Sequence, residues 1–279
     1  MLSSTAVKAV PVSYTQSSVN GNNLNVLAGF GGDGLLYGLI GGSAPARMDL
    51  TTNTITTISS GSVNAGAQER TAMSANNIMF AAAFVSSVWT FYSIGPYTGT
   101  QVPVTQIFVT SLGVVSSVAV DATGTTLYVH SPGIIQSYTG WNGTTATATV
   151  LSSSVNYDAA RIARSPTGTF YITNSGGYGG AFATGVTVNY TMTPAGVISS
   201  MVSSINISGA IVIDADGLPI ITGGSGTTAY ITKLTASTAT ILNGSSFDAS
   251  AINIALNPAS RVICVRPSGA NLIIYTPNY

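Results

Sequence analysis

The feature that most constrains the fold of this chain is a segment that recurs six times along its length. Each copy has a turn rich in Gly, Asp, Asn, Ser or Pro, followed by a strand-like run. Aligning the copies on the aromatic or aliphatic residue near the middle of that run gives Tyr37, Phe80, Tyr128, Tyr171, Ile220 and Ile263. The intervals are 43, 48, 43, 49 and 43 residues. A period of this length indicates an array of similar structural units.

The third copy shows what one unit contains. Four short runs rich in Val, Ile, Thr and Tyr are separated by "DATG", "SPG" and "GWNG", and they cover 117–121, 127–131, 134–139 and 146–151. No stretch of useful length has the apolar spacing of a helix. Four short strands in a repeat of this length are typical of one blade of a β-propeller. The sequence therefore predicts an all-β fold, a single six-bladed β-propeller domain over 1–279 with four-stranded antiparallel blades.

The ends of the chain predict how the ring closes. We expect blades at 23–62, 68–113, 115–153, 158–204, 207–245 and 250–279. The last blade lacks its outer strand, and the strand-like run at 7–15 can supply it. We expect Val10 to Tyr14 to pair with Leu272 to Tyr275, which would protect an open sheet edge. Pro11 suits an edge strand, because that position tolerates the missing N–H.

Two segments also resemble a known repeat family. "SVAVDATGTTLYVHS" and "ARIARSPTGTFYITNSG" resemble the repeats of YVTN/NHL-like propellers, in which a D-x-x-G or S-P-x-G turn precedes an "LYVT" or "YITN" strand. The resemblance covers part of each unit and is clearest in the third and fourth. It implies a fold rather than a chemistry, because such propellers act as scaffolds, binding proteins and occasionally enzymes.

Charge is scarce and balanced. Charged residues make up 6% of the chain, eight basic and eight acidic, against about 25% in an average soluble domain. No net field attracts the protein to nucleic acid or to an anionic membrane surface. No apolar run reaches the roughly 18–20 residues of a membrane-spanning helix, so we expect no membrane insertion.

The residues that commonly carry catalysis are few. His130 is the only histidine, and Glu69, the only glutamate, lies beside Arg70. Cys264 lies in a strand pattern, where a small buried hydrophobic residue is expected. No G-x-S-x-G sequence surrounds any serine. We therefore expect no catalytic residues and no enzymatic activity.

The aspartates have a structural interpretation. Four of them lie in turns between the first and second strands of the blades, where an Asp side chain caps its own turn: Asp33, Asp121, Asp214 and Asp216. The "DADG" segment at 214–217 shares Asp and Gly with calcium loops, but the remainder of that pattern is missing. Propeller hydrolases with a central metal need inward-facing ligands from several blades, a set this chain does not readily supply. We expect no metal and no cofactor.

Aromatic residues in loops are the candidate binding residues. The longest loop between second and third strands, 174–185, carries Tyr178 and Phe182 among five glycines, and Trp141 lies in the loop "YTGWNGTT". An exposed aromatic ring can stack on a sugar or dock on a protein. The alternative is that these rings simply pack onto their own blades.

The sequence thus favours a non-enzymatic structural protein. Our first hypothesis is a virion component of a bacteriophage, a head-decoration or tail-associated protein that contacts other structural proteins or copies of itself. The second is a glycan-binding propeller on a fibre or cell surface. The expected outer strands, such as "TITTISS", "TQIFVTS" and "TATATVLS", carry no charge, which favours association through neutral contacts.

Overall fold

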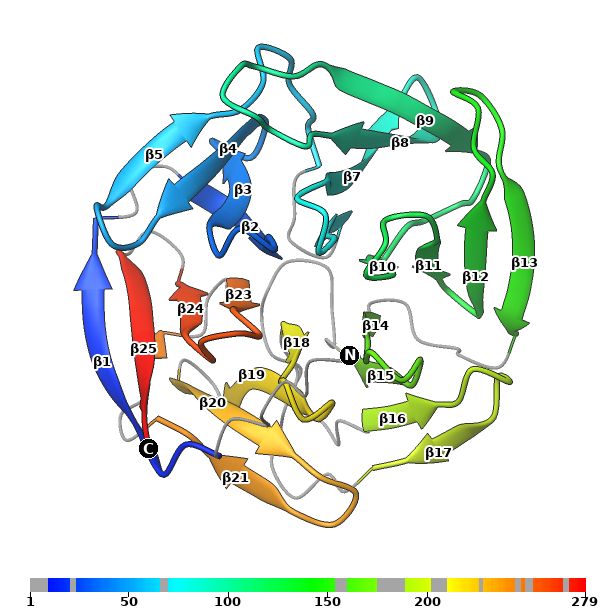
Figure 1. Ribbon diagram of the computed structural model, residues 1–279. Helices are drawn as coiled ribbons and strands as arrows, with labels where there is room; N and C mark the ends of the chain where they lie inside the picture. Colours follow the sequence, from blue (N-terminus) through cyan, green and yellow to red (C-terminus); the bar gives the residue numbers. More distant parts are fainter. Residues whose placement is uncertain are drawn as a thin grey trace, which may run out of the picture.

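The chain folds into six antiparallel sheets arranged around a central axis (Figure 1). This computed structural model describes residues 10–20, 24–65, 70–153, 160–174, 189–201, 210–225, 228–243, 247–248, 253–267 and 271–279. The elements in these ranges are strands, and the ranges contain no helix long and apolar enough to cross a membrane. The predicted six-bladed β-propeller is confirmed.

Each blade runs outward from the axis in chain order. Blade one contains β2 (Leu24–Phe30), β3 (Leu36–Ile40), β4 (Ala44–Asp49) and β5 (Thr54–Thr57). Blade two contains β6 (Thr71–Met73), β7 (Met79–Val85), β8 (Val88–Ile94) and β9 (Val104–Thr110). Blade three contains β10 (Ser117–Val120), β11 (Leu127–Ser131), β12 (Ile134–Thr139) and β13 (Thr147–Ser152).

The second half of the ring repeats this order. Blade four contains β14 (Ala160–Arg164), β15 (Phe170–Asn174), β16 (Asn189–Met192) and β17 (Ile198–Ser200). Blade five contains β18 (Ile211–Ile213), β19 (Pro219–Ser225), β20 (Thr228–Leu234) and β21 (Ala239–Ile241), and β22 (Phe247–Asp248) also pairs with β20. Blade six contains β23 (Asn253–Leu256), β24 (Ile263–Arg266), β25 (Leu272–Asn278) and, as its outer strand, β1 (Ser13–Val19).

The alignment used to find the repeat is confirmed by the strands. Every aligned residue lies on the second strand of its blade, β3, β7, β11, β15, β19 or β24. In blade three the second and third strands have the predicted bounds, while the first ends one residue earlier and the fourth begins one residue later. The period and the turn chemistry therefore predict the strands closely.

The ring closes with an N-terminal strand as expected, but this strand begins and ends later in the sequence than predicted. β1 pairs antiparallel with β25, with Ser13 opposite Asn278 and Val19 opposite Leu272. The predicted closing run, 7–15 with pairing from Val10 to Tyr14, was placed too early. Two side chains fix the observed position, because Tyr14 packs on the core between blades five and six and Val19 on the core between blades six and one.

The hydrophobic core is divided among the spaces between blades. Six clusters of buried residues lie in the described part of the chain, each joining two neighbouring blades. The cluster between blades two and three is aromatic. Phe91 stacks on Phe108 at 4.4 Å between ring centroids, and Phe108 stacks on Tyr138 at 4.8 Å. Inter-blade packing of this kind gives a rigid ring.

The backbone edges of two outer strands are partly paired by loops of the next blade, which the sequence did not indicate. The loop between β12 and β13 lies along β9, where Gly143 N–H donates to the Ile107 carbonyl at 2.8 Å and Val109 N–H to the Thr144 carbonyl at 3.1 Å. The Val102 N–H likewise donates to the Ile58 carbonyl next to β5, at 2.9 Å. These turns pair with part of the preceding blade's edge, which protects it from pairing with another chain.

Candidate functional site

The innermost strands of the six blades surround a central channel. Its cavity has a volume of about 590 Å³ and is lined largely by small and apolar side chains from β2, β6, β10, β14, β18 and β23. That volume lies in the range of small-molecule sites, roughly 300–1,000 Å³. The charged side chains on its wall are Asp121, Arg161, Arg164 and Asp214. The chemistry available in the channel depends on how far these groups are already engaged.

Asp121 is engaged by its own turn. Its carboxylate accepts hydrogen bonds from Thr125 N–H at 2.8 Å, Thr126 N–H at 3.0 Å and the Thr123 hydroxyl at 2.6 Å. Burial raises the pKa of Asp121, but these hydrogen bonds outweigh burial and leave that pKa below its ordinary value. The carboxylate therefore stays ionised and acts as a turn cap, as predicted.

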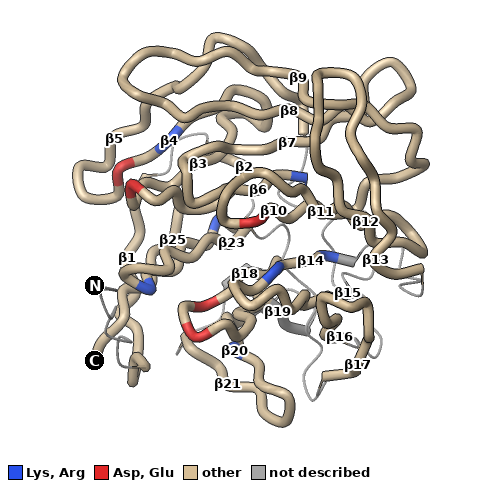
Figure 2. The backbone as a smooth tube through the Cα atoms, turned by 45° about the vertical axis from the view of Figure 1, so that its right-hand side comes forward, with Lys and Arg blue, Asp and Glu red and all other residues tan. Residues whose placement is uncertain are grey.

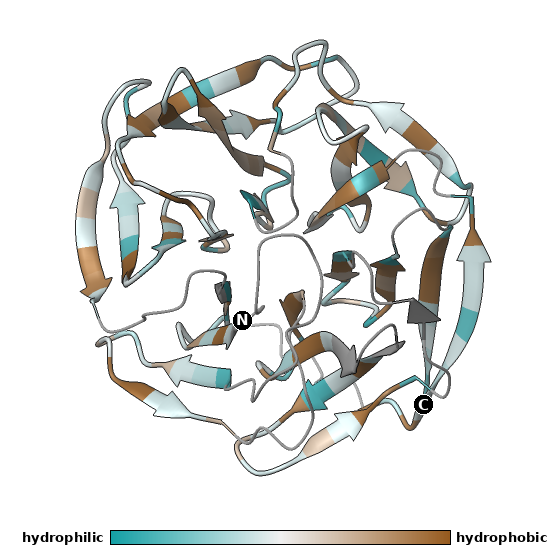
Figure 3. Ribbon diagram, turned by 180° about the vertical axis from the view of Figure 1, so that it is seen from behind, coloured by the Kyte–Doolittle hydropathy of each residue, from teal (hydrophilic) through white to brown (hydrophobic). Residues whose placement is uncertain are grey.

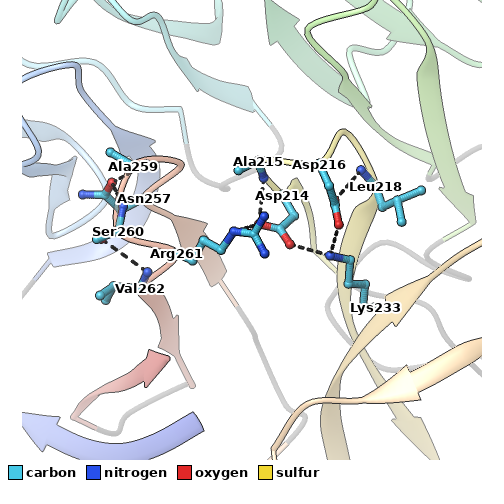
Figure 4. Close-up of polar contacts among 10 residues, drawn as sticks. All are labelled: Asp214, Ala215, Asp216, Leu218, Lys233, Asn257, Ala259, Ser260, Arg261 and Val262. Carbon is cyan, nitrogen blue, oxygen red and sulfur yellow. Dashed lines mark hydrogen bonds and ion pairs between the residues drawn. The ribbon is translucent and has the colours of Figure 1, made fainter. Parts of the chain in front are cut away.

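Asp214 belongs to a cluster of four charges that joins blades five and six (Figure 4). Lys233 on β20 places Nζ 2.5 Å from Asp214 Oδ2 and also contacts Asp216. Arg261, in the turn between β23 and β24, places Nε 3.6 Å from Asp214 Oδ1. The side chains of Asp214 and Arg261 are each 1% exposed. Two carboxylates and two cations balance one another, so Asp214 is held as a structural anion.

A tyrosine of the closing strand lies in the field of this cluster. Burial raises the pKa of Tyr14 to about 12, the carboxylate of Asp214 adds to the rise, and Arg261 opposes it. The phenol is therefore neutral at physiological pH. It serves as a packed anchor for β1 against blade five.

Two further arginines, one on β14 and one on β4, lie on aromatic rings. The Arg164 guanidinium lies 5.0 Å from the Tyr128 ring centroid, across the interface of blades three and four. The Arg47 guanidinium lies 4.5 Å from the Tyr97 ring centroid and 3.3 Å from Asp33 Oδ2. Such contacts hold an arginine at a blade interface without a dedicated site for a ligand.

The residues that could hold a metal do not gather in one place. Within the described ranges, no three His, Cys, Asp or Glu side chains are close enough to hold a metal ion together. His130 is fully buried on β11. Cys264 is buried on β24, and burial raises the pKa of its thiol. Neither residue is among the described residues that line the channel.

The structure gives Trp141 a packing role. The ring is half-buried and lies edge-on to Phe80 at 6.1 Å between centroids, with Phe108 at 6.4 Å. It anchors the loop that pairs with β9, and the partly exposed remainder of the ring keeps the binding prediction open. Tyr178 and Phe182 lie outside the described residues, as does Glu69.

Sequence reasoning missed the partners of Asp214. The "DADG" turn was singled out, but nothing local indicated that Lys233 and Arg261 would meet it. A weak signal existed, because five of only 16 charged residues fall in 214–261, and four of the five belong to this cluster.

Comparison with known proteins identifies the architecture alone. Neither a protein-family profile nor a curated protein sequence matches the chain. Among solved structures, it is similar to a protein of unknown function from Bacteroides thetaiotaomicron, with TM-score 0.61, 11% identity and coverage of 95% of this chain and 73% of that one. A proposed gluconolactonase gives 0.59, 11% identity and 96% and 93% coverage. A proposed TolB from Agrobacterium tumefaciens gives 0.59, 12% identity and 91% and 90% coverage.

At these identities the likeness concerns the fold. The neighbours are β-propellers of differing description, which agrees with the observed ring of blades. The same architecture carries unrelated functions, so the activity of this chain has to be argued from its own residues.

Proposed function

We propose that the protein is a non-enzymatic structural protein that works through neutral contacts with other proteins or with copies of itself. The setting that we propose is a bacteriophage particle, in which it decorates the head or belongs to the tail. Two properties support this proposal. The outer strands carry no charged residues, and the carboxylates around the channel are engaged in structural interactions.

One observation carries the proposal. The outermost strands of the six blades, β5, β9, β13, β17, β21 and β1, contain no Asp, Glu, Lys or Arg. Charged side chains on edge strands are a common means by which proteins avoid association. Valines and isoleucines stand on or beside these strands with large exposed fractions, including Val150 at 54% and Ile241 at 48%. Figure 3 shows apolar stretches reaching the outer strands of the ring.

The charged groups of the channel support a non-enzymatic role. A carboxylate that acts as a general base or as a nucleophile must be free to react. The two carboxylates on the channel wall are engaged, Asp121 by its own turn and Asp214 by Lys233 and Arg261. Both carboxylates therefore have a structural role in the blades.

The test is to locate the protein in its native setting. Mass spectrometry of gradient-purified particles from the source should find it at a stoichiometry comparable to that of the known structural proteins. Val150→Lys and Ile241→Lys place a charge on two outer strands and should reduce incorporation, while Ala259→Lys, at an exposed position in the turn between β23 and β24, serves as the control away from the outer strands. Particles that lack the protein altogether would contradict the proposal.

Two assays on the purified protein examine the alternatives. Turnover of glucono-δ-lactone, abolished by mutation of a channel residue, would favour an enzyme of the kind named for one structural neighbour. Saturable binding on a glycan array, lost in Trp141→Ala, would favour the glycan-binding hypothesis. We expect neither.

A further inference from the structure

The hairpin formed by β7 and β8 carries an apolar tip. Phe84 is 57% exposed and Val85 is 43% exposed, and they are the last two residues of β7. β7 has seven residues, whereas its equivalents β3 and β11 have five, and the extra residues lie at the turn end. At roughly 3.3 Å per residue this lengthens the hairpin by about 7 Å. The tip thus extends past the corresponding turns of blades one and three.

The turn at the tip of this hairpin has two serines where its backbone conformation favours glycine. Ser86 and Ser87 have φ of 49° and 68°, in the left-handed region. The same position in blade one holds Gly41 and Gly42, with φ of 58° and 76°. Glycine adopts this region freely, while a serine side chain is strained there. Departures of this kind gather at functional positions.

The exposed Phe84 ring packs against a buried tryptophan. Its centroid lies 5.3 Å from that of Trp89, which is 4% exposed. The Arg70 guanidinium lies 4.9 Å from the Trp89 ring centroid, and Arg70 Nε donates to the Val115 carbonyl at 3.3 Å. A rigid aromatic anchor loses little conformational freedom on binding, which is characteristic of residues that dominate protein interfaces.

The four strands of blade two carry no charged residue. No Asp, Glu, Lys or Arg occurs from Thr71 to Val120, a span that contains all four strands of the blade. Figure 2 shows this part of the backbone, around β7, β8 and β9, free of charged residues. These strands offer a charged partner no residue with which to form an ion pair. A second copy of the same blade is matched to it in charge, neutral against neutral.

We propose that the tip of the β7–β8 hairpin, Phe84 with Val85, is a self-association surface on which two copies of this chain meet across a two-fold axis. A two-fold interface brings the same patch of each subunit against itself, which suits an apolar, uncharged tip. The inference rests on the proposed function and names both its contact surface and its partner.

Sedimentation equilibrium of the purified protein tests the inference, from about 1 to about 200 µM. We expect a reversible dimer whose dissociation constant rises about 30-fold in Phe84→Ser, because each dimer loses two buried phenylalanines. Val85→Ser should weaken the dimer by a smaller factor. Tyr279→Ser is the matched control, since Tyr279 is an aromatic residue with the same 57% exposure but lies past the end of β25 in blade six. It should leave the dissociation constant unchanged.

Further outcomes separate the possibilities. Thermal melting checks that each variant folds, and if Phe84→Ser does not, Val85→Ser alone decides. The double variant Ser86→Asn, Ser87→Gly relaxes the turn, and it should keep the dimer while melting at a higher temperature. A wild-type protein that stays monomeric, or a dimer equally stable in Phe84→Ser and Tyr279→Ser, overturns the inference. Neither result decides the proposed function, which depends on the composition of the native particle.

Discussion

Asp214→Asn tests how the ring is held together between blades five and six. The substitution keeps the shape and an acceptor oxygen but removes the negative charge. Arg261, with a side chain only 1% exposed, then loses its paired carboxylate, whereas Lys233 retains Asp216. Removing one partner of a buried pair costs about 3–5 kcal/mol, because the remaining charge stays buried without compensation.

The matched variant Asp216→Asn also removes one negative charge, but from a more exposed position. Comparing the two variants therefore isolates the effect of burial. The Asp216 side chain is 26% exposed, and an ion pair in such a position contributes at most about 1 kcal/mol. For a chain of this length each kcal/mol shifts the melting temperature by about 2–4 °C. We therefore expect a fall of about 10 °C or more in Asp214→Asn and of about 3 °C or less in Asp216→Asn.

Differential scanning calorimetry at neutral pH measures both. Adding Arg261→Met to Asp214→Asn removes the uncompensated charge, so the double variant should recover a large part of the lost stability. Equal melting temperatures for Asp214→Asn and Asp216→Asn would refute the reasoning. So would a double variant less stable than Asp214→Asn alone.

Three further predictions follow from the packing of single groups. Burial, with a hydrogen bond to Asp33, raises the pKa of Tyr37 from 10.0 to about 12, so the contribution of Tyr37 to stability is full below pH 10 and is lost as the pH rises through 12. In Tyr37→Phe the free energy of unfolding, measured with urea, should therefore fall less steeply between these pH values than in the wild type. An equally steep fall would contradict this. The buried Cys264 thiol, whose pKa burial raises, should react with a disulfide reagent at least about 100-fold more slowly in the native than in the unfolded protein; comparable rates would show an accessible thiol. Deleting 1–19 removes β1 and should lower the melting temperature by about 5 °C or more, since seven residue pairs with β25 are lost; an unchanged calorimetric transition would show that β1 contributes nothing to closure.

The repeating architecture could be predicted from the sequence because local sequence patterns determine it. The turn before each aligned residue and the strand after it recur at a steady period, and both are set by residues a few positions apart. The closing strand was placed too early because β1 is weakly patterned. Its position depends on where Tyr14 and Val19 find packing partners in neighbouring blades.

Contacts between blades could not be predicted in this way. An arginine in the turn "NPASRVIC" is ordinarily expected in solvent, yet Arg261 is buried because Asp214 of the preceding blade faces it. Trp141 resembled an exposed loop aromatic, and its contacts with Phe80 and Phe108 come from another blade. Pairings of this sort depend on how blades are placed next to one another. The binding roles given to Tyr178 and Phe182 stay predictions.

The most direct test of the proposed neutral assembly is the salt dependence of the protein's attachment to its native particle. Purified particles would be washed in buffer at about 0.05 M and at about 0.5 M salt, pelleted, and assayed for the protein in pellet and supernatant. Contacts made by uncharged strands and apolar side chains are little screened, so the protein should stay in the pellet at both concentrations. Release at the higher concentration would show that ionic contacts hold it, and would contradict the account.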